Sequence, residues 1–328
     1  MGNDESIGLV LSGGGAKGAF QAGVWKAMCE LGLADRVSVI SGTSVGAING
    51  AAFATLRDPE TICRFWRTKV GDIATPNLTN LAQGQFIVAI KDVLQGKPFP
   101  FRGLLDRSAL GTILSSLLPR RWPEGAPEVY ATALECRGCL FGTLDSDCYE
   151  RQCFFLNEEL SADNRIKQLL ASAAIPWGFD PVDLNGRRYV DGSWDAMGGD
   201  NIPVSQILER RPDIRTIIVV RCNCAADEPE AVNATIPRGT TLVEVRPRSS
   251  LRGPLDIASD LLPDASSFND FPIVGKLAQG VEALSRQIRI WSGTLAFDGE
   301  YAKRFIKQGY SEGMTTLRQM KPKARLNW

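Results

Sequence analysis

The sequence predicts an α/β domain built on a parallel sheet, and three observations support this. Residues 7–11 form an apolar run that is typical of a buried strand. Residues 16–33 follow with apolar side chains at helical spacing, then a second short strand over 37–40 and a small, apolar helix over 45–56. Strands that alternate with helices in this way pair in parallel through right-handed crossovers.

The remaining elements follow in order. Strands are predicted over 129–134, 140–144, 153–156, 187–190, 216–220 and 241–245, and helices over 164–174 and 204–210. Residues 61–127 are less regular, with helical stretches over 81–94 and 108–118, and we expect a helical insertion over a site there. Residues 268–320 are mostly helical. No repeat or break in composition divides the chain, so residues 1–328 are expected to form a single domain.

Composition excludes several classes of protein. The 328 residues include 37 basic and 37 acidic side chains, a balance that argues against a nucleic-acid binder. Histidine is absent, which rules out Ser-His-Asp catalysis, HExxH zinc sites and His-ligated haem within this chain. The acidic N-terminus does not resemble a secretory signal, and no apolar run reaches the ~20 residues that span a bilayer. We therefore expect a cytoplasmic protein with reduced thiols that contacts membranes peripherally, if at all.

A glycine-rich loop connects the first predicted strand and helix. Its residues are Gly13, Gly14, Gly15, Ala16, Lys17 and Gly18. Such a loop presents backbone N–H groups beside a helix N-terminus, where negative charge is favoured. The loop also matches the dinucleotide fingerprint GxGxxG, which expects an acid at the end of the second strand. Asp35 precedes that strand instead, so an oxyanion-binding loop is the favoured interpretation, with a simple tight turn as the other alternative.

A GxSxG motif follows the second predicted strand, at Gly42, Thr43, Ser44, Val45 and Gly46. A nucleophile on a sharp strand-to-helix turn needs small neighbours on both sides, which the two glycines supply. The alternative is that Ser44 only caps the following helix.

A serine nucleophile needs a base, and without histidine a carboxylate is the natural substitute. Asp191 and Gly192 directly follow the predicted strand over 187–190, where we expect a sharp, exposed turn of the kind that active sites use. Asp-Gly is also an ordinary turn dipeptide, so this motif alone does not identify a base.

Together the three motifs, in this order, resemble the patatin-like phospholipase family from about residue 7 to residue 203, and the segment 171–176 before the aspartate agrees. The resemblance implies a three-layer α/β/α sandwich with a mainly parallel central sheet, and no metal or cofactor. It implies Ser44 as nucleophile and Asp191 as its base. The oxyanion hole and its motifs would comprise Gly13, Gly14, Gly15, Lys17, Gly18, Gly42, Val45, Gly46 and Gly192. The implied activity is hydrolysis of fatty-acyl esters of phospholipids or lysophospholipids through an acyl-enzyme.

Two residues depart from the family pattern. Lys17 stands where arginine is commoner, which keeps the positive charge. Ser193 replaces the usual Gly or Ala after Asp-Gly and adds a hydroxyl beside the proposed base.

Two weaker features leave alternatives open. Cys136, Cys139, Cys148 and Cys153 have spacings that a four-thiolate zinc site could use, although buried or incidental thiols are favoured. The apolar residues between 86 and 105 are interpreted as core packing or as a lid that contacts lipid.

Three other functions are alternatives to acyl hydrolysis. An acyltransferase of the malonyl-CoA:acyl carrier protein type would need a histidine base, and an oxidoreductase would need the ribose acid. The third alternative is an effector whose lipase activity is latent until a partner or ligand binds. Labelling of Ser44 by a fluorophosphonate would separate most of these readings.

Overall fold

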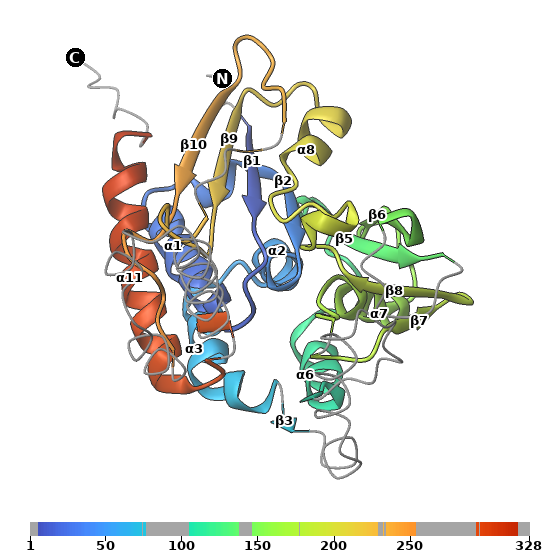
Figure 1. The fold of residues 1–328 in the computed structure, drawn as a ribbon. Helices are drawn as coiled ribbons and strands as arrows, with labels where there is room; N and C mark the ends of the chain where they lie inside the picture. The colour runs from blue at the N-terminus through green and yellow to red at the C-terminus, as the bar shows by residue number, and fades with distance from the viewer. Residues whose placement is uncertain are drawn as a thin grey trace, which may run out of the picture.

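A mixed eight-stranded sheet forms the centre of the molecule (Figure 1). The computed structural model describes residues 6–73, 75–76, 105–137, 146–176, 178–228, 232, 234–253, 293–294 and 296–320. The strands of the sheet are β1 (Ile7–Leu11), β2 (Val37–Thr43), β5 (Glu128–Cys136), β6 (Tyr149–Phe155), β7 (Val182–Leu184), β8 (Arg187–Asp191), β9 (Thr216–Val220) and β10 (Thr241–Val245). A separate two-stranded ribbon pairs β3 (Thr75–Pro76) with β4 (Leu105–Asp106).

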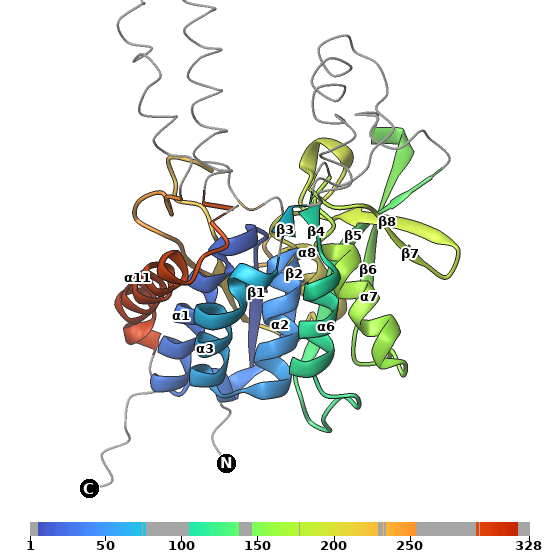
Figure 2. The ribbon, with the colours of Figure 1, turned by 90° about the horizontal axis from the view of Figure 1, so that it is seen from below.

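Helices cover both faces of this sheet. They are α1 (Gly18–Glu30), α2 (Val45–Leu56), α3 (Pro59–Lys69), α6 (Ser108–Leu117), α7 (Ala162–Ser172), α8 (Val204–Arg210) and α11 (Gly299–Leu317). Figure 2 shows α1, α2, α3, α6 and α11 on the near side of the sheet and α8 behind it. Alternate strand residues therefore face two cores. Leu9 and Leu11 pack with α1 and α2, whereas Val10 packs with Ile207 of α8. The three-layer α/β/α prediction is confirmed.

The strand order is β10-β9-β1-β2-β5-β8-β7, with β6 also pairing with β5. The run from β10 to β5 is parallel throughout, as predicted. Beyond it, β5 pairs antiparallel with both β6 and β8, and β8 pairs antiparallel with β7. The sheet is thus parallel where the glycine loop and the GxSxG motif lie, and antiparallel where Asp191 lies.

Strand β5 brings distant parts of the chain to one place. Its residues Glu128–Thr132 pair with β2, and Ala133–Cys136 pair with β8. Because β6 pairs along Tyr130–Cys136, which overlaps both stretches, β2 and β8 must share the opposite edge of β5. They meet there end to end. Thr43, the last residue of β2, lies opposite Thr132, and Asp191, the last residue of β8, lies opposite Ala133.

Some of the other predicted helices and strands are confirmed, and others lie outside the described residues. The helices at 108–118 and 164–174 form with ends shifted by one or two residues, as α6 and α7. The predicted strand over 140–144 and helix over 81–94 lie outside the described residues. From the region predicted as an insertion, α3 packs against α1 and α11. Strand β7 was not predicted, because three residues are too few to show a pattern. No described helix is long and apolar enough to cross a membrane.

Among the cysteines that the structure describes, Cys148 differs from expectation. Cys29, Cys63, Cys136, Cys153, Cys222 and Cys224 are free thiols, as expected for a reducing compartment. Cys148 is disulfide-bonded, so the expectation that every thiol is reduced is wrong there.

Candidate active site

Ser44 lies on the turn between β2 and α2. Its backbone has φ 58° and ψ −128°, a left-handed conformation that costs a non-glycine residue about 1–3 kcal/mol. The side chain makes no capping hydrogen bond to the helix, so the alternative reading of Ser44 as a helix cap is wrong. Strain at a residue with no capping role is typical of a nucleophile held at a sharp strand-to-helix turn.

The glycines on either side of Ser44 are required by close backbone contacts. A Cβ atom on Gly42 would lie 2.4 Å from the carbonyl carbon of Gly46. A Cβ atom on Gly46 would lie 2.2 Å from the carbonyl oxygen of Leu11 at the end of β1. No side chain fits at either position, and Val45 between them begins α2. The GxSxG spacing thus lets α2 start directly against the ends of β1 and β2.

Asp191 ends β8 and is completely buried, and Ser44 is only 3% exposed. The expectation that Asp191 would sit in an exposed turn is therefore wrong, because the end of β8 meets the end of β2 on one edge of β5. Burial raises the pKa of the Asp191 carboxyl from 3.8 to about 6, while hydrogen bonds from Ser44 and Ser193 lower it. The N–H of Ser193 donates to Asp191 Oδ1 at 2.8 Å.

The second carboxyl oxygen of Asp191, Oδ2, is buried and accepts no hydrogen bond of normal geometry. Burial raises the pKa of this carboxyl, and the Ser44 hydroxyl has the largest of the effects that lower it again. Catalytic hydrogen bonds are often long or poorly aligned before substrate binds. The arrangement thus pairs a serine hydroxyl with a buried carboxylate that has one oxygen available to accept its proton.

Ser172 holds the backbone of the Ser44 turn through hydrogen bonds of its hydroxyl. Its hydroxyl accepts the N–H of Ser44 at 2.9 Å and donates to the carbonyl of Thr132 at 2.6 Å. Two residues on, the carbonyl of Ala174 accepts the N–H of Asp191 at 3.0 Å. The segment 171–176, noticed in the sequence only as part of a family pattern, therefore holds the backbones of both Ser44 and Asp191.

The glycine loop packs directly on these residues. A Cβ atom on Gly13 would lie 3.1 Å from Ser44 Cβ and 3.3 Å from Ser193 Cβ. The Gly13 N–H donates to Asn201 Oδ1 at 2.9 Å, so the fold already uses this donor. Gly15 has φ 55°, in the left-handed region that favours glycine. The structure thus brings Gly13, Ser44 and the Asp191–Gly192 turn together, and Gly18 lies against Val45 and Trp66 at the start of α1.

Lys17 points to another part of the molecule. Its ammonium group donates to Asn223 Oδ1 at 2.6 Å, in the loop after β9, and its side chain is 1% exposed. Burial lowers the pKa of this ammonium group, and the nearby Cys222, Asp227 and Glu228 raise it. Lys17 therefore anchors the end of the loop, and the structure does not place its charge on the Ser44 hydroxyl.

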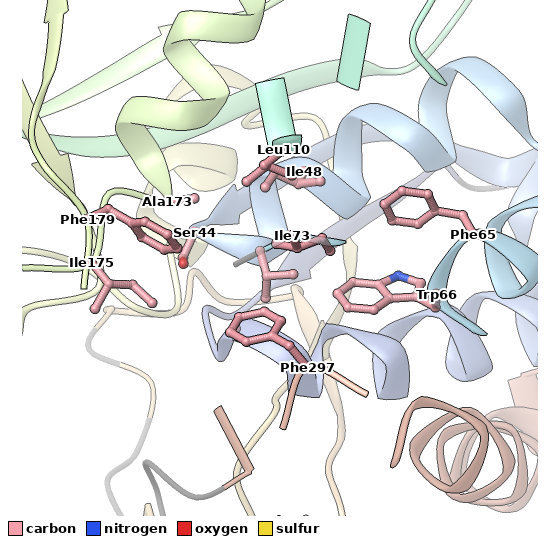
Figure 3. Close-up of a pocket in the computed structure, with 12 residues that line it drawn as sticks. Ser44, Ile48, Phe65, Trp66, Ile73, Leu110, Ala173, Ile175, Phe179 and Phe297 are labelled. Carbon is pink, nitrogen blue, oxygen red and sulfur yellow. The ribbon is translucent and has the colours of Figure 1, made fainter. Parts of the chain in front are cut away.

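An apolar pocket opens beside Ser44 (Figure 3). Its space, including the part that is open to solvent, is about 440 Å³. Figure 3 shows Ser44, Ala173, Ile175 and Phe179 at one end and Phe65 and Trp66 at the other. Between them the lining is aliphatic and aromatic, with Gly15, Val45, Ile48, Ile73, Leu110 and Phe297. A hydroxyl at one end of an apolar pocket suits a ligand with one reactive polar group and a long apolar chain.

A match to a family model decides the relationship of this chain to known proteins. The model described as patatin-like phospholipase matches residues 9–208, which include Ser44 and Asp191. The chain belongs to the patatin-like phospholipase family. The match ends within α8.

Curated relatives within the patatin-like family match over short stretches. The lysophospholipase nte1 of Aspergillus terreus is 48% identical over 65 residues, which cover 20% of this chain and 4% of that protein. The patatin-like phospholipase domain-containing protein 7 of Rattus norvegicus is 50% identical over 53 residues, 16% of this chain and 4% of that protein. The chain thus matches only a small part of the length of these relatives.

Solved structures resemble the chain over most of its length, but distantly. VipD from Legionella pneumophila has a TM-score of 0.43 and 15% identity, covering 96% of this chain and 67% of that one. Human GIVD cytosolic phospholipase A2 has a TM-score of 0.42 and 12% identity, covering 94% of this chain and 60% of that one.

Two alternatives from the sequence find no support in the geometry. Asp35 lies in a short 3₁₀ turn (Ala34–Arg36) before β2, at the edge of the sheet opposite the glycine loop, where it cannot meet a ribose bound there. For a zinc site, no three His, Cys, Asp or Glu side chains gather as metal ligands among the residues that the structure describes. Because Cys148 is in a disulfide, the proposed four-thiolate set is also incomplete.

Sequence reasoning missed Ser172 and Asn201. Neither carries a local signal, because each acts through a hydrogen bond to a residue more than a hundred positions away.

Proposed function

We propose that this protein is a lipid acyl hydrolase that cleaves fatty-acyl esters of phospholipids or lysophospholipids with Ser44 as nucleophile and Asp191 as general base. The observation that carries the proposal is the strained, buried Ser44 between a buried carboxylate and the mouth of an apolar pocket. Membership of the patatin-like phospholipase family supports it, as do relatives named lysophospholipase.

The first half-reaction forms an acyl-enzyme. Asp191 takes the proton of Ser44 Oγ as this oxygen attacks the ester carbonyl carbon, and the carbonyl oxygen becomes an oxyanion. The N–H groups of Gly14 and Gly15, with that of Val45 at the start of α2, are the donors proposed for this oxyanion. As the tetrahedral intermediate collapses, the bond from carbon to the leaving alcohol breaks. Asp191 returns the proton to the departing oxygen.

The second half-reaction releases the fatty acid. Water replaces the alcohol, Asp191 takes one of its protons, and the hydroxide oxygen attacks the acyl carbon. Collapse breaks the bond to Ser44 Oγ, which regains a proton from Asp191. The acyl chain occupies the pocket between Ser44 and Trp66 throughout.

A fluorophosphonate probe with an alkyl chain tests the proposal. We expect covalent labelling of the purified protein, a labelled peptide that maps to Ser44, and hydrolysis of palmitoyl lysophosphatidylcholine. Ser44→Ala should abolish both, and Ser115→Ala, at an exposed serine of α6, should change neither. Labelling at another serine, or hydrolysis that survives in Ser44→Ala, would refute the proposed nucleophile.

Two expectations about location stay predictions. Most of the apolar stretch from residue 86 to 105, interpreted as core packing or as a lid that contacts lipid, lies outside the described residues. A cytoplasmic location and peripheral contact with membranes are therefore proposed from the sequence and the substrate class alone.

A further inference from the structure

Asn201 lies where the three sequence motifs meet. Its Oδ1 accepts the N–H of Gly13 at 2.9 Å, and its Nδ2 donates to Glu228 Oε1 at 3.1 Å. The preceding residue, Asp200, accepts the hydroxyl of Thr43 on its carbonyl at 2.7 Å and donates its N–H to the carbonyl of Gly192 at 2.8 Å. Two adjacent residues thus contact the glycine loop, the nucleophile turn and the Asp191 turn.

Glu228, which accepts the second hydrogen bond of Asn201, is itself part of an ion-pair cluster. Its carboxylate lies 3.5 Å from the guanidinium of Arg221, which is 1% exposed and also pairs with Glu244 on β10. Arg221 directly follows β9, and because its guanidinium is buried, moving the carboxylates away would leave its charge uncompensated. Asn201 is therefore linked through Glu228 to the buried Arg221 at the end of β9.

The hydrogen bond to Asn201 restricts a backbone that would otherwise be free to take several conformations at Gly13. Glycine has no side chain to pack, and its backbone is the most permissive of any residue. The Oδ1 atom of Asn201 fills the space where a Cβ atom of Gly13 would be, at 2.8 Å from that position. Gly14 and Gly15, the proposed oxyanion donors, follow directly, so their placement depends on that of Gly13.

We infer that Asn201 is a positioning residue that sets the glycine loop against Ser44, so that the loop's N–H groups meet the oxyanion. The inference rests on the proposed function, since it assigns the loop the oxyanion role. Asn201 itself touches no reacting atom and acts through Gly13.

Asn157 offers a matched control. Its Oδ1 accepts a backbone N–H, that of Val129, at 2.8 Å, and its Nδ2 donates to the carbonyl of Pro127 at 3.1 Å. It therefore makes the same kind of contacts, at the opposite end of β5 from Asp191. A loss of activity caused only by lower stability would appear in both alanine variants.

The test compares two ligands of equal chain length. An alkyl boronic acid forms a tetrahedral anion on the serine and needs the oxyanion donors, whereas the matching alkyl alcohol needs only the apolar pocket. In Asn201→Ala we expect the inhibition constant of the boronic acid to rise about 10- to 100-fold, with kcat falling by a similar factor, because small displacements of catalytic groups cost up to about 100-fold. The inhibition constant of the alcohol should stay within about twofold. Asn157→Ala should change neither constant.

The outcomes separate the inference from the function on which it rests. Unchanged boronic acid inhibition in folded Asn201→Ala, equal weakening of both ligands, or the same loss in Asn157→Ala would overturn the positioning role. A wild-type protein that neither binds the boronic acid nor labels at Ser44 would instead overturn the proposed function. If Asn201→Ala does not fold, Asn201→Ser gives the same comparison, because its shorter side chain cannot reach both Gly13 and Glu228.

Discussion

Replacing Asp191 by asparagine should abolish hydrolysis and at the same time stabilise the fold at alkaline pH. The carboxyl is completely buried, and its Oδ2 atom has no hydrogen-bond partner of normal geometry. Asparagine has the same shape, keeps an oxygen for the N–H of Ser193, and carries no charge that must be buried. It cannot take a proton from Ser44, so catalysis is lost for a reason unrelated to stability.

The size of the stabilisation follows from the shifted pKa. Asp191 has a pKa of about 6 in the folded protein, against 3.8 for the ordinary carboxyl that represents the unfolded chain. Between these values the folded protein binds more protons, so the free energy of unfolding falls as pH rises through this window. At 1.36 kcal/mol for each pKa unit, the loss is about 1 kcal/mol at pH 4.5 and about 3 kcal/mol at pH 8. Asp191→Asn escapes this loss and should gain about those amounts.

Urea unfolding of both proteins at pH 4.5 and pH 8 measures the difference. Two controls separate the causes. Ser44→Ala removes activity but keeps the buried carboxylate, and Asp183→Asn removes a charge from β7, where the side chain is 77% exposed. Relative to wild type, neither control should become more stable between pH 4.5 and pH 8. The reasoning fails if Asp191→Asn is less stable than wild type at pH 8, or if its advantage is the same at both pH values.

Four further predictions concern activity. The kcat/KM for a soluble ester should fall about tenfold per pH unit below a pKa of about 6, because only ionised Asp191 accepts the serine proton. Ser193→Ala removes a hydroxyl that lowers the pKa of Asp191, so the fall in kcat/KM should begin at a higher pH in this variant. A fall centred at pH 7.5 or above in the wild-type protein would count against Asp191 as the base. Ile48→Phe, one helical turn after Ser44 in the pocket lining, should reduce hydrolysis of palmitoyl esters more than about tenfold relative to butyryl esters, and equal effects on both would contradict the pocket assignment. Activity should survive excess EDTA, because backbone N–H groups are the proposed oxyanion donors and no metal ion is needed. A loss of activity that Zn²⁺ or Ca²⁺ restores would contradict this assignment.

The sequence predicted the parallel half of the sheet and its two turns because the signals there are local. Strand, glycines and helix follow one another within about ten residues, and Gly42 is required by a contact inside the turn itself, whereas Gly46 is required by the end of β1. The burial of Asp191 was not predictable in this way. It depends on β2 and β8 meeting on one edge of β5, and no local pattern shows which strands share an edge.

The supporting residues lie further from what a sequence pattern can show. Ser172 is separated from Ser44 by 128 positions, and Asn201 from Gly13 by 188. A serine in a helix and an asparagine in a loop are common, and only the folded geometry distinguishes these two from others. Lys17 shows the converse. Its place in a motif suggested a role beside the nucleophile, whereas its hydrogen bond to Asn223 directs it to the loop after β9.

The absence of histidine and the burial of Asp191 belong to one physical argument. A serine nucleophile near neutral pH needs a base with a pKa close to the imidazole value of about 6.5, and an exposed aspartate, near 3.9, is too weak a base. Enclosing the carboxyl at the junction of β2 and β8 raises its pKa to about 6 and supplies that basicity without an imidazole. The same desolvation destabilises the ionised protein by about 3 kcal/mol. If Asp191 is the base, its strength in catalysis and its cost to stability must therefore change together, and a variant that lowers the pKa of Asp191 should be a slower enzyme and a more stable protein at pH 8.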